Sequence, residues 1–184
     1  DAVVELLVVE VPVRVPARDT QAHGLAKFSI SPDGTTIHFR LIVANIDNVV
    51  ASHIHVGASG TNGPVVLFLY GPAPAAGGRT DGVLSEGSAT AANLVGPLAG
   101  QPLSALIDAM NSGNAYVNVH TNDGIDPTNT GPGDFPGGEI RGRPGDQHSR
   151  SGRGSEDADA RSRRAANRAG AHVDQHAERR MVSH

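Results

Sequence analysis

Residues 24–43 read GLAKFSISPDGTTIHFRLIV, and apolar side chains recur in them at every second position on either side of a turn. A period of two is typical of a strand with one buried face. The segment Ser31-Pro32-Asp33-Gly34 predicts the turn, because Pro sets φ and Gly allows a positive φ. We therefore expect an antiparallel β-hairpin with these residues facing inward: Ala26, Phe28, Ile30, Ile37, Phe39, Leu41 and Val43.

Further strands are expected on both sides of several Gly/Pro-rich loops. The continuous apolar run at 65–69 is typical of a strand covered on both faces. Residues 71–80 are expected to form a loop, and 88–94 are a weaker strand candidate. The remaining expected strands are 52–56, 64–70, 115–120 and 139–143.

One helix is expected, over residues 104–111. Leu103, Leu106, Ile107 and Met110 recur at helical spacing, with Ser104 as a candidate for the start. Gly113 is a candidate for the end. Many short strands with one short helix predict an all-β domain, a Greek-key β-sandwich or barrel.

The apolar pattern stops near Arg143, which predicts a domain over residues 1–143 and a disordered polar tail over 144–184. The tail is rich in Arg, Ser, Ala, Asp and His, so it cannot bury enough surface to offset its ordering entropy. Residues 1–143 hold seven Lys and Arg against 13 Asp and Glu, a net charge of −6. An acidic domain argues against nucleic acid as a partner, because phosphate binding needs a positive face.

Composition excludes several other classes of site. The chain has no cysteine, so disulfides, thiolate zinc sites and cysteine nucleophiles are excluded. No apolar run approaches the roughly 20 residues of a membrane-spanning helix. The first residue is Asp rather than Met, as expected after removal of a leader or in a fragment.

Two segments carry a family resemblance. One reads ASHIHVG at 51–57 and continues to GTNGPVV at 60–66, and the other reads GNAYVNVHT at 113–121 and continues to PGGEIRG at 136–142. Together they resemble the chordin-type CHRD domain over about residues 10–143. The resemblance implies a β-sandwich, an extracellular or cell-envelope (periplasmic) location and no known reaction. The segment at 10–16 only approximates the opening strand of the family.

The histidines in these two segments are the candidate site. Strand alternation places His53 and His55 on one face, opposite Ile54 and Val56. His120 lies on the polar face of its own strand, so the three rings converge if the two strands are neighbours. Three neutral imidazoles suit copper or zinc, with an open fourth position. His23 and His38 are further candidates that no spacing favours.

The same three histidines are similar to copper ligands of the copper–zinc superoxide dismutases, which are Greek-key sandwiches. The resemblance implies a superoxide-dismutase-like sandwich as an alternative to an immunoglobulin-like one. His53, His55 and His120 match three of the four copper ligands. The bridging histidine, the zinc loop and the disulfide of that family have no counterpart here, so the dismutase reaction is not expected to follow.

A structural role is the alternative for these residues. The rings would then hold the loops through hydrogen bonds to backbone, Asn118 or Thr121. Asn118, Glu139 and Arg141 are expected around the cluster. Glu139 and Arg141 are expected to share one face of the last strand, where a cross-strand salt bridge is the structural interpretation and orientation of an imidazole by Glu139 the functional one.

Other chemistry finds little support. Gly57, Gly60 and Gly63 fit turns better than a dinucleotide loop, because no helix follows. A calcium site at Asp123, Asp126 and Asp134 fits no known loop spacing. A hydrolase lacks any residue constellation. Two functions remain: a non-catalytic secreted or envelope domain that binds a protein or matrix partner, and a mononuclear copper or zinc domain. The oligomeric state is not indicated.

Overall fold

The computed structural model describes residues 6–9 and 19–144; in residues 6–9 it describes the backbone alone. The expected tail and the segment at 10–16 therefore lie outside the described residues, apart from Pro144. The elements are β1 (Leu6–Val9), β2 (His23–Ile30), β3 (Thr36–Asp47), β4 (Val49–Val56), β5 (Val65–Tyr70), β6 (Arg79–Thr90), α1 (Leu103–Asn111), β7 (Ala115–Thr121) and β8 (Ile140–Gly142), with short 3-10 turns at Ala91–Asn93 and Gly96–Leu98.

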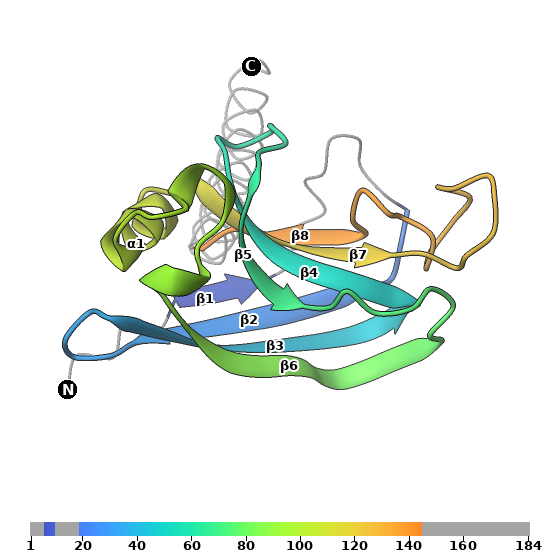
Figure 1. Ribbon diagram of the computed structural model, residues 1–184. Coiled ribbons are helices and arrows are strands. Elements are labelled where there is room, and N and C mark those ends of the chain that lie inside the picture. The colour runs from blue at the N-terminus through green and yellow to red at the C-terminus, as the bar shows by residue number, and fades with distance from the viewer. Residues whose placement is uncertain (1–5, 10–18, 145–184) are drawn as a thin grey trace, which may run out of the picture. The chain divides into compact units, whose positions relative to one another are not determined.

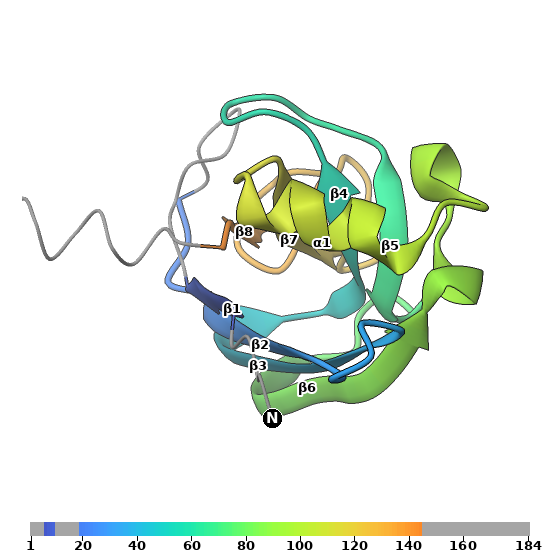
Figure 2. The ribbon, with the colours of Figure 1, turned by 90° about the vertical axis from the view of Figure 1, so that its left-hand side faces the viewer.

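Two four-stranded antiparallel sheets form a β-sandwich, which confirms the predicted fold class. The first sheet has the order β1-β2-β3-β6 and the second β5-β4-β7-β8. Figure 2 shows the two sheets as separate layers, and Figure 1 shows α1 at the end of the sandwich opposite the loop that joins β7 to β8. Within the described part of the chain, no helix has the length and apolarity needed to span a membrane.

The predicted hairpin is formed by β2 and β3. Gly34 has a φ of 71° and donates its N–H to the Ser31 carbonyl at 2.8 Å. Asp33 accepts hydrogen bonds from Ser31 Oγ and from Thr35 N, which lower the pKa of its carboxyl. The inward face is as expected, with Phe28 and Ile37 at 1% and 0% exposed.

Strand β6 differs from the prediction for residues 88–94. It begins at Arg79, pairs with β3 along most of its length and ends at Thr90, and two 3-10 turns follow. The strand carries glycines and mostly exposed side chains, and Ala89 is its one buried residue. Because backbone pairing with β3 forms this strand and few of its side chains are buried, its sequence shows no alternation of apolar and polar residues.

Three smaller differences have local causes. Helix α1 begins at Leu103 behind Pro102, so Ser104 is not its cap; Gly113 follows its end with a φ of 71°. Strand β5 is an edge strand, and Phe68 on it is 51% exposed rather than covered. Strand β8 is shorter than expected, at Ile140–Gly142.

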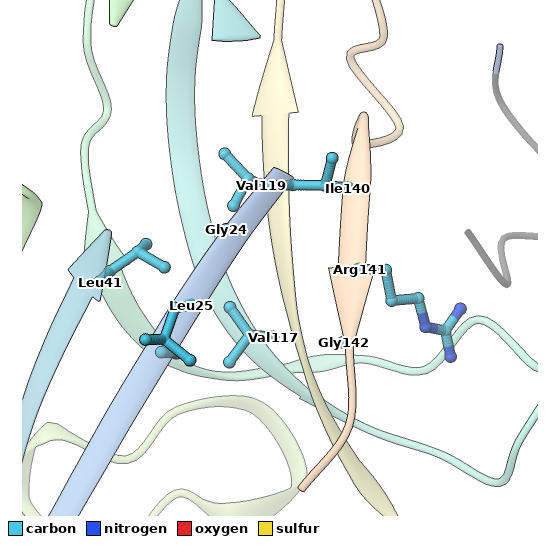
Figure 3. A pocket seen from close by; sticks show the side chains of 9 residues that line it. Gly24, Leu25, Leu41, Val117, Val119, Ile140, Arg141 and Gly142 are labelled. Carbon is cyan, nitrogen blue, oxygen red and sulfur yellow. The ribbon is translucent and has the colours of Figure 1, made fainter. Parts of the chain in front are cut away.

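A small apolar hollow lies between the sheets near β2 and β8. In Figure 3, Leu41 and Val117 face each other across it, and the Arg141 side chain points away from it. Its volume of about 20 Å³ holds roughly one water molecule, too little for an organic ligand. The sheets approach closely here, because a Cβ on Gly24 of β2 would lie 3.1 Å from Ile140 Cδ1 of β8 in the other sheet.

Candidate metal centre

Strands β4 and β7 are neighbours, so the condition for convergence of the histidines is met. His53 pairs with Asn118 and His55 with Tyr116 in the antiparallel register. His120 follows on the same outer face of β7, two residues beyond Asn118. The alternate residues form the core, as the sequence predicts: Ile54 is 1%, Val117 5% and Val119 2% exposed.

The three rings lie close together. Nδ1 of His53 lies 3.1 Å from Nε2 of His120, and the ring centroids of His55 lie 5.8 and 5.9 Å from those of His53 and His120. One ligand nitrogen from each ring lies within 4.8 Å of the others. Nitrogens that share an ion at about 2.0–2.1 Å are at most about 4.2 Å apart. The spread of up to 4.8 Å is therefore close to the span of ligands around one ion, and slightly wider than it.

Backbone carbonyls fix two of the rings. Nδ1 of His55 lies 2.9 Å from Gly63 O, and Nδ1 of His120 lies 2.8 Å from Pro136 O. Because a carbonyl only accepts, each Nδ1 is the protonated atom and each Nε2 carries the lone pair. Such an outer hydrogen bond on the second nitrogen is characteristic of metal-ligating histidines.

Gly63 allows the first of these contacts. A Cβ at this position would lie 1.6 Å from Val56 O, a distance that no side chain tolerates. The loop between β4 and β5 therefore reaches β4 only with glycine here. Tyr116 fixes the same part of the loop, because its hydroxyl oxygen accepts a hydrogen bond from the Gly63 N–H at 2.8 Å.

His53 is suited to bind as a neutral ligand. Burial, followed by the charges of the neighbouring His120 and His55 rings, lowers its pKa from 6.5 to about 4. Metal ions bind neutral imidazole, so no proton has to be displaced from this ring at neutral pH. Phe68 packs edge-on against it, with ring centroids 4.7 Å apart.

Asn118 lies next to the cluster and is 4% exposed. Its Nδ2 donates to Gly137 O at 3.2 Å, and its backbone carbonyl accepts from Ser52 Oγ at 2.9 Å. A Cβ on Gly138 would lie 2.2 Å from Asn118 Oδ1, so the loop backbone presses against the amide. Asn118 thereby fixes the loop that carries Pro136, the partner of His120.

Glu139 has partners other than the two considered from sequence. Its carboxylate is buried and accepts hydrogen bonds from Thr20 Oγ1, from Thr121 Oγ1 at 2.8 Å and from Gly133 N at 2.8 Å. Thr121 alternates with His120 on β7, so this carboxylate lies on the side of the strand away from the imidazoles. It anchors the loop between β7 and β8, in place of the expected imidazole contact or cross-strand salt bridge.

Arg141 lies on the outer face of the second sheet. Beside it the structure places Tyr116 and Arg143, which the sequence analysis did not assign to the site. The Arg141 guanidinium carbon is 3.3 Å from the centroid of the Tyr116 ring, which also stacks on His55 at 5.0 Å and 7°. Arg143 lies nearby, 5.2 Å from the same centroid. Burial, followed by the charge of Arg143, lowers the pKa of Arg141. Period-two spacing with His120 places Tyr116 on this face.

The other candidate ligands lie elsewhere. His38 is on β3 of the first sheet, where Nδ1 lies 2.7 Å from Ser88 Oγ, and His23 begins β2. Asp123 and Asp134 bond within their own loop, to Ile125 N and Thr130 N. Across the described ranges, the three histidines form the only metal-sized group of three or more His, Cys, Asp or Glu residues.

Comparison with known proteins gives one match. The family model described as the CHRD domain matches residues 9–143, which are most of the chain and include all three histidines. No curated protein and no solved structure is significantly similar to the chain.

Proposed function

This chain belongs to the CHRD domain family, and we propose that its β-sandwich is an extracytoplasmic binding domain that holds one copper or zinc ion at His53, His55 and His120. The observation that carries the proposal is the placement of one ligand nitrogen from each ring within 4.8 Å of the others. The rings come from two strands that are far apart in sequence and adjacent in the sheet.

The donor set favours copper or zinc. Three imidazole nitrogens suit either ion, whereas magnesium and calcium prefer oxygen ligands. The chain supplies three donors, so a fourth position stays open to water or another ligand. The proposal assigns no reaction. Asn118 and Arg141 would support the site through the loops and through Tyr116, and the contacts of Glu139 support the same loop from the core side.

The location and the partner rest on the family. A CHRD domain is expected outside the cytoplasm, and the absence of cysteine is compatible with that compartment. We propose a protein or matrix component as the partner, contacted through the loops at the ends of the sandwich.

A second candidate is a purely structural role for the histidines. Their rings already hold the loops through the carbonyls of Gly63 and Pro136, and His53 and His120 contact each other directly. In that case the domain is a binding or scaffolding module without an ion.

Metal titration distinguishes the two. The chain is freed of metal with a chelator, and Cu(II) or Zn(II) is added while the melting temperature is followed. Metal at about 100 times its dissociation constant should stabilise the fold by about 2.7 kcal/mol. The gain should vanish in His120→Gln and persist in His38→Gln, which alters a histidine of the first sheet. If the melting temperature is the same with and without either metal, the metal function is contradicted and the structural role of the histidines remains.

A further inference from the structure

A column of stacked groups leads away from the histidine cluster. His55 stacks on Tyr116 in a nearly parallel arrangement, with centroids 5.0 Å apart, and the Arg141 guanidinium carbon lies 3.3 Å from the same centroid. A ring has two faces, and His55 occupies one of them. Arg141 therefore covers the other face, one aromatic layer behind His55, which places a positive charge close to the site.

Neutral groups hold the charge of Arg141, and Arg143 lies beside it. Arg141 is 6% exposed and donates to Asn62 Oδ1 at 3.1 Å and to Thr61 O at 2.5 Å. Arg143 is 8% exposed and donates to the carbonyls of Gly57, Ala58 and Gly113. The oxygens of Asn62 and Thr61 fix the Arg141 guanidinium without cancelling its charge, because an amide and a carbonyl carry none.

The proposed ligands are also uncharged. His55 and His120 direct their Nδ1 protons at carbonyls, so both rings bind as neutral imidazoles. The nearby Glu139 carboxylate is bound by Thr121 and Gly133 on the core side of β7. The three ligands therefore leave the charge of a divalent ion uncancelled. The Arg141 guanidinium adds a positive charge on the same outer face, whereas the Glu139 carboxylate lies on the other side of β7.

We propose that the ion takes a small monovalent anion as its external ligand, in the fourth position. This inference rests on the proposed metal function and names the ligand class of the same site. Access is from solvent, since His53 and His120 are only partly buried and Phe68 beside His53 is 51% exposed. An anion here offsets the charge of the ion, and the Arg141 guanidinium, which is itself 6% exposed, adds to the attraction.

The test uses the full chain loaded with one equivalent of Cu(II). Azide is titrated and its charge-transfer absorption is followed, and imidazole serves as the uncharged ligand in a parallel titration. We expect a saturable complex with one azide per copper. In Arg141→Gln, azide affinity should fall about five- to tenfold, while imidazole affinity should stay the same.

Two matched variants separate charge from structure. Arg141→Lys keeps the charge and should keep azide affinity within about twofold. Arg40→Gln removes an exposed arginine of the first sheet and should change neither ligand. An equal loss of azide and imidazole binding in Arg141→Gln, or a wild-type copper protein that forms no azide complex, would overturn the inference. Failure to bind copper at all is seen before azide is added, and contradicts the metal function instead.

Discussion

Nδ1 of His53 lies 3.1 Å from Nε2 of His120, although 67 positions separate the two residues in the chain. The contact joins adjacent strands diagonally on the outer face of the second sheet. With the Nδ1 proton of His120 directed at Pro136 O, the metal-free contact is a hydrogen bond from His53 to His120. An ion bound at Nδ1 of His53 would take the place of that proton, and the neutral His53 ring would then carry its proton on Nε2.

The metal-free domain should lose stability below about pH 6.5. The pKa of His53 is lowered from 6.5 to about 4 in the folded chain. The unfolded chain therefore takes up a proton on His53 before the folded chain does, and the free energy of unfolding falls as the pH drops from about 6.5 toward 4. Above about pH 6.5 this loss is absent, and the free energy of unfolding no longer depends on the protonation of His53. Urea unfolding with a chelator at several pH values measures the slope.

The variant His53→Gln should show a shallower dependence on pH, and His38→Gln should follow the wild type. Identical slopes in the wild type and His53→Gln would show that this ring does not titrate as described.

Truncation of a buried and of an exposed phenylalanine should change the free energy of unfolding by very different amounts. Phe28 is 1% exposed in the core, so Phe28→Ala should destabilise the domain by about 3–5 kcal/mol. Phe68 is 51% exposed, and Phe68→Ala should cost less than about 1 kcal/mol. Chemical denaturation of both variants measures the difference, and equal costs would place Phe68 inside the core.

Glu139→Gln should destabilise the domain by about 1–3 kcal/mol, because the carboxylate accepts bonds from two hydroxyls and a backbone N–H in a buried position. Glu86→Gln is the matched control. Glu86 forms an exposed pair with Arg40 at 3.5 Å, so its loss should change stability by less than about 0.5 kcal/mol. Comparable costs in urea unfolding would contradict the anchoring role of Glu139.

Gly138→Ala should cost about 1–3 kcal/mol more than Gly100→Ala. Both glycines have positive φ, but a Cβ on Gly138 would strike the Asn118 amide, and a Cβ on Gly100 meets nothing within 4 Å. Gly138→Ala should also weaken metal binding, since the shifted loop carries Pro136, the partner of His120. A metal affinity equal to that of the wild type would show that loop position does not tune the site.

Alternation explains why the hairpin and the histidine faces could be predicted from sequence. One buried face forces apolar residues into every second position, so Ile54 and Val119 indicate where His53 and His120 must point. Strand β6 leaves no such pattern, because its mostly exposed side chains contribute little to the core and backbone pairing with β3 forms it.

The surroundings of the histidines depend on loop conformation and strand register, which spacing does not encode. The Gly63 and Pro136 carbonyls reach the rings only after two loops fold over the sheet. The stack of Arg141 on Tyr116 needs the pairing of β7 with β8. Glu139 precedes the first residue of β8, so strand alternation with Arg141 does not decide the side on which its carboxylate lies.

Strands β4 and β7 direct alternate residues to two separate tasks: valine and isoleucine fill the sandwich, and the rings stand outside it. A protein engineer could exchange the ligands for another donor set without opening a void beneath them. The three ligands would move to another antiparallel strand pair only together with loop carbonyls equivalent to those of Gly63 and Pro136, which orient His55 and His120.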